Sequence, residues 1–227
     1  MKAFVLERYG RPLSAVDMPV PEPGPRQVLV RMIASGVNHA DERTRIGEFK
    51  AVFRLDLPKV MGGELSGEVV AVGSQVTELA VGDQVYGYTG VVAMGTWAEF
   101  VVVDADALAP APRSISLAQA ASLPVVALTA WQSLVTIGRL QPGQTVLVHG
   151  GAGGVGSAVI QLAKHLGATV ATTASASSVR SPMGLTPAPA ARECPSRAWR
   201  HLTRVGMPPA ETPSISETCP SSARRAR

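Results

Sequence analysis

Cysteine is almost absent from this sequence of 227 residues, and both copies, Cys194 and Cys219, lie near its end. Residues 1–193 therefore contain no thiol that could form a disulfide framework. They also contain no thiolate to bind a structural metal ion. A hydrophobic core must hold this part together, and a hydrophobic content of 46% is ample for one.

Long hydrophobic runs are also missing. The longest candidate, residues 123–135, is shorter than the roughly 20 apolar residues of a membrane helix. It is interrupted by Thr129, Gln132 and Ser133. Near the N-terminus, Glu7 and Arg8 occupy the place where a secretory signal would need apolar residues. We therefore expect a soluble, cytoplasmic protein without a membrane partner.

Most of the chain lacks a basic surface, although the formal net charge is +4. Residues 1–178 carry 13 Lys and Arg against 14 Asp and Glu, whereas residues 179–227 carry 8 against 3. The positive charge therefore does not indicate a nucleic-acid-binding face on the folded part. We expect no nucleic-acid partner.

Residues 179–227 contain no lysine and no apolar periodicity, but they hold 8 prolines and 8 arginines. This composition is typical of a disordered segment. A parallel sheet would need further strand and helix units here to bury both of its faces. We therefore hypothesise that the chain is truncated, or read out of frame, after about Ser178.

Residues 1–115 are rich in β-branched runs bounded by Gly, Pro or Asp, which predict short strands. Their spacing favours a compact domain of β-barrel type. A short helix is expected near residues 38–49, where Asp41 would cap a turn. The predicted strands are 27–37, 67–73, 83–88 and 98–104.

Residues 116–178 change to alternating helix and strand. Ser116 is expected to cap a first helix, and Leu128, Trp131 and Leu134 mark the apolar face of a second. A turn and a buried strand follow within residues 140–150. The stretch after it predicts a glycine turn, a helix and a second strand ending at 174–175, which is the start of a dinucleotide-binding fold.

The glycine turn carries the pattern G-x-G-x-x-G at Gly151, Gly153 and Gly156. In such a turn the first glycine allows a tight bend, the second lets a diphosphate approach the backbone, and the third lets helix and strand pack closely. The diphosphate then meets free N–H groups at the positive end of the helix. The alternative is a turn that serves packing only.

The end of the second strand bears on which dinucleotide would bind. An acidic residue there would accept the ribose hydroxyls of NAD. The sequence instead has TTASASS, with small hydroxyl side chains and no acid. This favours NADP(H), with Ser175 as a candidate hydrogen-bond donor to the 2′-phosphate.

Together these motifs resemble the medium-chain dehydrogenase/reductase superfamily, and within it the zinc-free quinone oxidoreductase and alkenal (enone) reductase branch. The resemblance runs from Met1 to about Ser175. It is carried by VLVRMIASGVNHAD, GELSGEVVAVGSQV, VGDQVYG, AASLPVVALTAWQSL and VLVHGGAGGVGSAVIQLAKHLGA.

The resemblance implies an α/β protein in three parts. These are a GroES-like β-barrel-type catalytic domain (1–115), an incomplete Rossmann domain with a doubly wound parallel sheet (116–178), and a tail (179–227). It also implies a homodimer for the intact family. The implied activity is NADPH-dependent reduction of a small quinone or enone.

The resemblance also assigns roles to single residues. Asn38 would line the cleft for nicotinamide and substrate, as the catalytic and cofactor-binding side chain, or it would only cap a turn. Thr129 would contact the cofactor, or it would bond its own helix backbone. Phe49 would form a hydrophobic wall. The backbone at Ala152, Gly153, Gly154 and Val155 would bind the diphosphate.

No metal site is implied. Zinc enzymes of the superfamily place ligands where this chain has Asn38, Gly63 and Val125 or Val126, and His39 is a single imidazole without a partner. Without a Lewis acid, hydride addition to a quinone or enone is favoured over alcohol chemistry. Two alternatives stay open, an inactive truncated fragment and an enoyl reductase of a fatty-acid or polyketide pathway.

Overall fold

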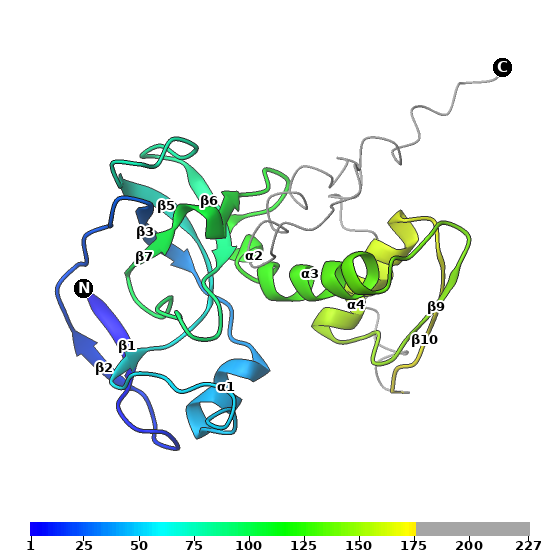
Figure 1. The fold of residues 1–227 in the computed structure, drawn as a ribbon, viewed down its shortest axis with the longest axis horizontal. Coiled ribbons are helices and arrows are strands. Elements are labelled where there is room, and N and C mark those ends of the chain that lie inside the picture. Colours follow the sequence, from blue (N-terminus) through cyan, green and yellow to red (C-terminus); the bar gives the residue numbers. More distant parts are fainter. Residues whose placement is uncertain (176–227) are drawn as a thin grey trace.

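The computed structural model describes residues 1–175, so the predictions for residues 179–227 lie outside the described residues. The described part forms two lobes, joined through the helices near the centre of Figure 1. No helix within residues 1–175 is both long and apolar enough to cross a bilayer.

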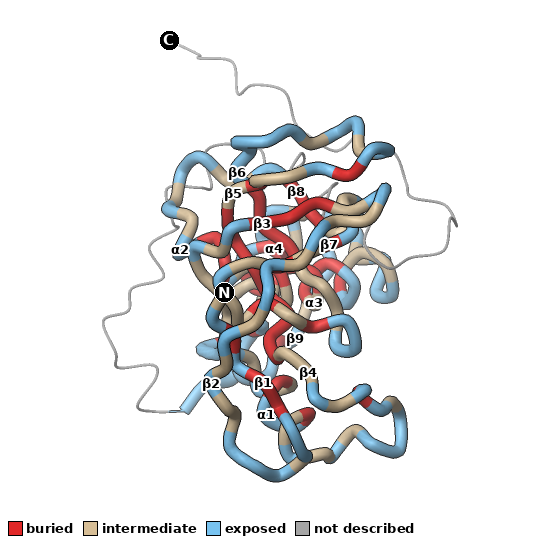
Figure 2. Tube along the Cα trace, turned by 90° about the vertical axis from the view of Figure 1, so that its left-hand side faces the viewer, coloured by how far each residue is buried: buried red, intermediate tan, exposed pale blue. Residues whose placement is uncertain are grey.

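A five-stranded antiparallel sheet of order β7-β3-β5-β6-β8 forms the centre of the first lobe. The four strands predicted from the sequence are all in it, which confirms them. Consecutive residues are buried in its central strands β3, β5 and β6, so both faces are partly covered, and the buried strands are visible in Figure 2. The strands are β3 (Gln27–Ala34), β5 (Glu64–Val72), β6 (Gln84–Tyr88), β7 (Phe100–Asp104) and β8 (Leu108–Pro110). Its core contains Val28, Val30, Leu65, Val69, Val85, Val101, Val103 and Leu108.

A second sheet of order β2-β1-β4 lies beside the first and was not predicted. Its strands, β1 (Lys2–Leu6), β2 (Ser14–Asp17) and β4 (Lys59–Val60), are short. Such short runs carry little periodicity, so only pairing across the chain reveals them. Leu6 and Met61 are fully buried beneath this sheet, together with Leu55 and Met94.

Helix α1 (His39–Ile46) follows β3 and precedes β4 in the sequence, and it confirms the predicted helix. Its N-cap is Asn38, whereas Asp41 lies one turn inside and accepts a hydrogen bond from the Asn38 backbone N–H at 2.7 Å. Asp41 therefore does cap α1, as predicted, but as the N3 residue of a capping box: it accepts from the backbone N–H of the N-cap residue.

The second lobe begins with α2 (Leu117–Ala120), which Ser116 caps as predicted. Helix α3 (Pro124–Trp131) continues as a π-helical turn, η2 (Gln132–Ile137). Leu128, Trp131 and Leu134 are buried, which confirms the predicted apolar face.

Strands β9 (Thr145–Val148) and β10 (Thr169–Thr172) pair in parallel, connected by α4 (Gly154–His165). This is the predicted strand–helix–strand unit. Trp131 and Leu134 pack against Leu162 and Ala163 of α4. Helix α3 and the turn η2 therefore pack on α4, whereas α2 packs against Tyr86 and Ala109 of the first lobe.

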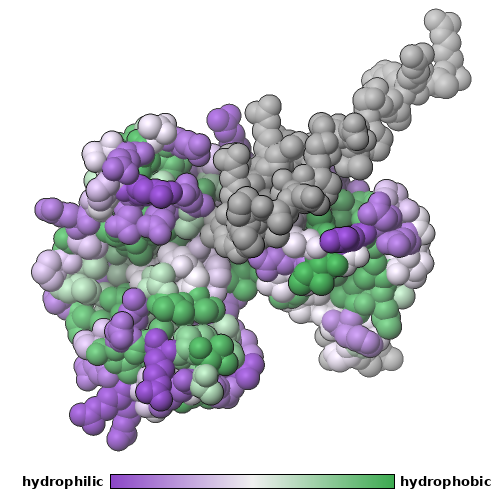
Figure 3. Space-filling model, in the orientation of Figure 1, coloured by the Kyte–Doolittle hydropathy of each residue, from purple (hydrophilic) through white to green (hydrophobic). Residues whose placement is uncertain are grey.

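The prediction that residues 140–150 contain a buried strand is wrong in one respect. Within β9 only Val148 is buried, and Leu147 is 61% exposed. Among the described residues β9 pairs only with β10, so its other edge is open. A strand of a doubly wound sheet is buried only when helices cover both of its faces. The second lobe accordingly shows apolar surface in Figure 3.

Candidate functional site: a glycine turn and a buried carboxylate

The glycine turn joins β9 to α4. Gly150 has φ of +68°, a left-handed conformation that favours glycine, so it makes the tight bend that the sequence pattern assigned to Gly151. Gly153 is the N-cap of α4 in an extended conformation. Within residues 1–175 the N–H groups of Gly154, Val155 and Gly156 have no acceptor.

The glycines of the motif divide into buried and exposed positions. Gly151 and Gly156 are buried. A Cβ on Gly151 would overlap Thr172 Oγ1 of β10, and one on Gly156 would overlap Gly150 O. These two glycines therefore serve close packing, as predicted for the third one.

The residues between them face outward. Ala152, Gly153, Gly154 and Val155 are exposed. A Cβ on Gly153 would meet only Gly150 O, at 3.3 Å, so the space above this backbone is open. Because free N–H groups and the positive helix end coincide there, these residues fit a bound diphosphate.

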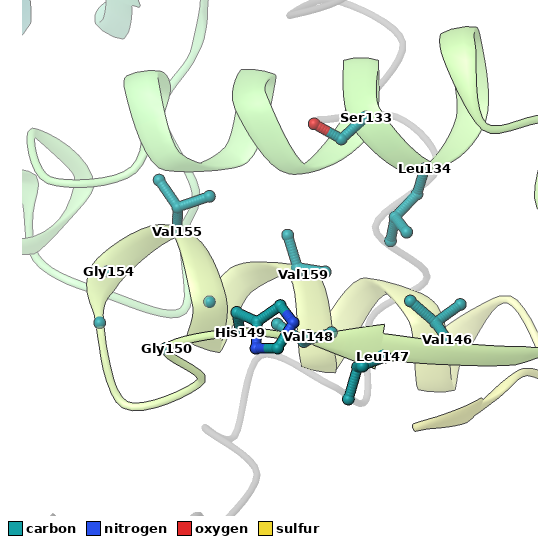
Figure 4. A pocket seen from close by; sticks show the side chains of 12 residues that line it. Ser133, Leu134, Val146, Leu147, Val148, His149, Gly150, Gly154, Val155 and Val159 are labelled. Carbon is teal, nitrogen blue, oxygen red and sulfur yellow. The ribbon is translucent and has the colours of Figure 1, made fainter. Parts of the chain in front are cut away.

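A cavity of about 560 Å³ opens beside the turn. Figure 4 shows it between η2, β9 and α4. Its size lies within the roughly 300–1,000 Å³ of small-molecule sites. The lining comprises Ser133, Leu134, Val146, Leu147, Val148, His149, Gly150, Gly153, Gly154, Val155, Gly156 and Val159.

The end of β10 is fastened to the start of this turn. Gly151 N donates to Thr173 O at 2.9 Å, and His149 Nδ1 lies 3.2 Å from Thr173 Oγ1. Ser175 is exposed two residues further along the chain. Sequence reasoning missed His149, although its place between a strand and the glycine turn marks it.

Glu64 is a second feature that sequence reasoning did not single out. It is 2% exposed at the start of β5. Its Oε2 accepts a hydrogen bond from Asn38 Nδ2 at 2.6 Å, and its Oε1 accepts one from Val125 N at 2.6 Å. Asn38 is half-buried and caps α1, so the capping alternative for Asn38 is realised alongside this contact.

Burial perturbs the acidic groups around Asn38. It raises the pKa of Glu64 above its usual value, although the N–H donors of Val125 and Asn38 oppose this shift. Burial likewise raises the pKa of Asp41. It also raises the pKa of Tyr88, the cross-strand neighbour of Glu64, to about 12. Tyr88 therefore keeps its proton at neutral pH.

Thr129 and Phe49 have partners of their own. Thr129 is half-buried in α3, and its Oγ1 donates to Val125 O at 2.7 Å, which is the backbone alternative. Phe49 stacks on Phe53 with 5.6 Å between ring centroids, and the Arg43 guanidinium lies 4.8 Å above its ring.

The three positions where zinc enzymes of the superfamily carry ligands hold Asn38, Gly63 and the pair Val125 and Val126. Gly63 and the two valines have no side chain that can bind a metal ion. Residues 1–175 also contain no cluster of three His, Cys, Asp or Glu side chains placed to bind one.

The fold and site define a protein in which an antiparallel β domain precedes a parallel strand–helix–strand unit with a glycine turn. Residues 24–113 match the family model of the alcohol dehydrogenase GroES-like domain. The chain belongs to the medium-chain dehydrogenase/reductase superfamily.

Among curated relatives, an NADPH-dependent alkenal/one oxidoreductase of Arabidopsis thaliana, described as chloroplastic, is 43% identical over 190 residues. That match covers 77% of this chain and 48% of the relative. Other relatives are polyketide synthases, such as GfsB of Streptomyces halstedii, 42% identical over 72% of this chain and 3% of that protein.

Solved structures of the same superfamily are similar to this chain in fold and sequence. An alcohol dehydrogenase superfamily protein from Novosphingobium aromaticivorans matches with a TM-score of 0.75 and 45% identity, covering 78% of this chain and 54% of that one. A quinone oxidoreductase from Coxiella burnetii matches with a TM-score of 0.69 and 39% identity, covering 78% and 57%. The chain thus spans about half the length of these structures and of the Arabidopsis relative.

Proposed function

We propose that this chain carries the catalytic domain and the first part of the cofactor domain of an NADPH-dependent reductase of quinones or α,β-unsaturated carbonyls. The observation that carries the proposal is the exposure of residues 152–155, together with the N–H groups at the start of α4 that have no acceptor within residues 1–175. The names of the Arabidopsis and Coxiella relatives support the substrate class.

The preference for NADPH over NADH rests on the end of β10. Residues 169–175 contain no acid to accept the ribose hydroxyls of NAD. Thr173 brings a hydroxyl group beside the turn instead, and the hydroxyl of Ser175 follows two residues later. Such groups suit a 2′-phosphate. The name of the Arabidopsis relative, which specifies NADPH, supports the same choice.

The nicotinamide, when bound, supplies the hydride. The chain's own residues bind the cofactor and orient the nicotinamide and the substrate. The N–H groups of Gly154 and Val155 hold the diphosphate, and Gly153 leaves room for it. Asn38, fixed by Glu64, offers its amide to the nicotinamide or to the substrate oxygen. A quinone or enone oxygen gains negative charge during reduction, and hydrogen-bond donors and water can stabilise that charge.

We include zinc independence in the proposal. It is supported by the side chains at Asn38, Gly63, Val125 and Val126, which do not form a ligand set for zinc. Reduction of a conjugated carbonyl spreads the developing charge and so depends less on a Lewis acid than alkoxide chemistry does.

The test is a titration of the chain with NADPH, followed by the loss of NADPH absorbance with 9,10-phenanthrenequinone or trans-2-hexenal. Ala152→Glu places a carboxylate in the diphosphate cradle and should weaken NADPH binding about tenfold or more. Gln161→Glu, which adds the same charge to the exposed face of α4, is the matched control. Equal affinity in both variants would refute this binding mode. Binding without turnover would identify an inactive fragment.

The polyketide synthase relatives favour one second candidate, an enoyl reductase. The chemistry is the same hydride addition to a conjugated carbonyl, but the substrate is a thioester. Crotonyl-coenzyme A therefore separates the two candidates. Faster turnover of this thioester than of hexenal would favour the enoyl reductase.

A further inference from the structure

Glu64 connects the two lobes through one buried carboxylate. Its Oε2 accepts from the Asn38 amide beside α1, and its Oε1 accepts from the Val125 backbone N–H at the start of α3. Each carboxylate oxygen thus accepts from a different element, and both donor–acceptor distances are 2.6 Å.

The surroundings leave this carboxylate little freedom. A Cβ on Gly36 would overlap Glu64 Oε2, so a side chain at that position would displace the carboxylate. Helix α3 has Leu123 as its N-cap, and no side chain of its own caps it. Glu64 therefore supplies from β5 the anionic cap that α3 lacks.

Helix α3 carries this restraint to the cofactor side of the site. Val126, next to the bonded Val125, is the side chain nearest to Gly154, and a Cβ on Gly154 would lie 3.2 Å from Val126 Cγ1. Thr129 lies one turn further along α3. The carboxylate that holds Asn38 in the first lobe therefore also holds the helix that touches the glycine turn.

We propose that Glu64 is a positioning residue of the candidate site, which fixes the Asn38 amide group and sets the start of α3 relative to it. The relevance to cofactor and substrate rests on the function proposed above. A carboxylate only accepts hydrogen bonds, so Asn38 must turn Nδ2 toward it. Asn38 Oδ1 is then turned away from Glu64, toward the backbone N–H of the first turn of α1 that Asn38 caps.

If Glu64 positions Asn38, donor and acceptor groups must match between residues 38 and 64. Space filling or helix capping alone would not require this match. Glu64→Gln keeps the shape but has one acceptor and one donor. If the amide oxygen of the new glutamine keeps the bond from Val125 N–H, its NH₂ group faces the Asn38 NH₂ group. The Asn38 amide must then rotate by half a turn so that its oxygen accepts instead. Asn38→Asp in turn places two carboxylates side by side. Combining the two substitutions restores a donor facing an acceptor.

The experiment is a double-substitution cycle on the full chain. Thermal unfolding should show that Glu64→Gln and Asn38→Asp each lower the melting temperature, and that Asn38→Asp/Glu64→Gln recovers most of the loss. Glu68→Gln is the matched control, because Glu68 lies on the same strand and forms an exposed ion pair with Arg31. It should leave the melting temperature unchanged. If either single variant fails to fold, folding of the double variant is the readout.

Additive losses in the double variant would overturn the proposal, because they would show that Glu64 does not act through Asn38. These measurements need no ligand, so the proposal stays testable if NADPH does not bind. Failure of the wild-type chain to bind NADPH would instead refute the proposed function.

If the wild-type chain binds NADPH, a second experiment compares the ligand affinities of the wild type and of Glu64→Gln. Glu64→Gln should weaken NADPH binding roughly two- to tenfold, the loss expected for one hydrogen bond between neutral groups. It should leave binding of 2′,5′-ADP, which lacks the nicotinamide, nearly unchanged. Equal losses for both ligands would contradict positioning through Asn38 and indicate general damage.

Discussion

Gly156→Ala tests how closely α4 packs on the glycine turn. Gly156 lies buried in the first turn of α4. A Cβ at this position would overlap Gly150 O and would lie 2.8 Å from Gly151 Cα. Both of these are backbone atoms, so no side chain can rotate away, and the helix or the turn must move.

Two opposing effects set the magnitude. Replacing a helical glycine by alanine stabilises a helix by about 1 kcal/mol when there is space. Overpacking of a tight contact destabilises by roughly 1–3 kcal/mol. Since the contact here is with backbone, we expect the upper part of that range. The free energy of unfolding should therefore fall by about 1–2 kcal/mol, and NADPH binding should weaken because the cradle is displaced.

Urea unfolding followed by circular dichroism measures this change. Gly154→Ala is the matched control, because it lies on the same helix and its Cβ would meet only the end of the Val126 side chain, at 3.2 Å. We expect it to alter stability far less. If Gly156→Ala proves as stable as the wild type, the helix does not approach the turn as closely as described.

Three further predictions concern the surface, the buried acids and the metal. Leu147→Lys should increase the monomeric fraction in light scattering, because Leu147 lies exposed on the open strand β9; Val81→Lys, at an equally exposed turn, should not. Burial raises the pKa of Glu64 above its ordinary 4.5, so the folded chain holds this proton more tightly than the unfolded chain does. Relative to Glu64→Gln, the stability of the wild type should then decrease as pH rises from about 4.5 through the raised pKa, and an increase would contradict the assignment. Elemental analysis should find no stoichiometric zinc in the purified chain, and one zinc per chain would refute zinc independence.

Much of the fold was predictable because local patterns specify it. Strands β3, β5, β6 and β7 are runs rich in β-branched residues between turns, and α2 starts at a serine cap. Strands β2 and β4 were not predicted because they have only four and two residues, whereas β1 is as long as β6 and was missed. The exposure of Leu147 was missed because a buried strand and an uncovered one share the same apolar composition.

The site divides in the same way. The glycine motif and its helix followed from spacing, yet the tight bend falls at Gly150, outside the motif. Asn38 and Thr129 were named through resemblance, and the bond of Thr129 to its own helix backbone was one of two alternatives, but Glu64 as the partner of Asn38 could not be named. Whether they contact a cofactor stays a prediction that the variants above address.

The sequence by itself determined the turns, the helix starts and the strand–helix–strand unit, because glycine conformations, serine caps and apolar periodicity act within a few residues. It did not determine the contact between Asn38, Glu64 and Val125. Glu64 lies 26 residues from Asn38 and 61 from Val125 along the chain. Only the tertiary structure brings these groups together, because a buried carboxylate must find its donors wherever the packed elements place them.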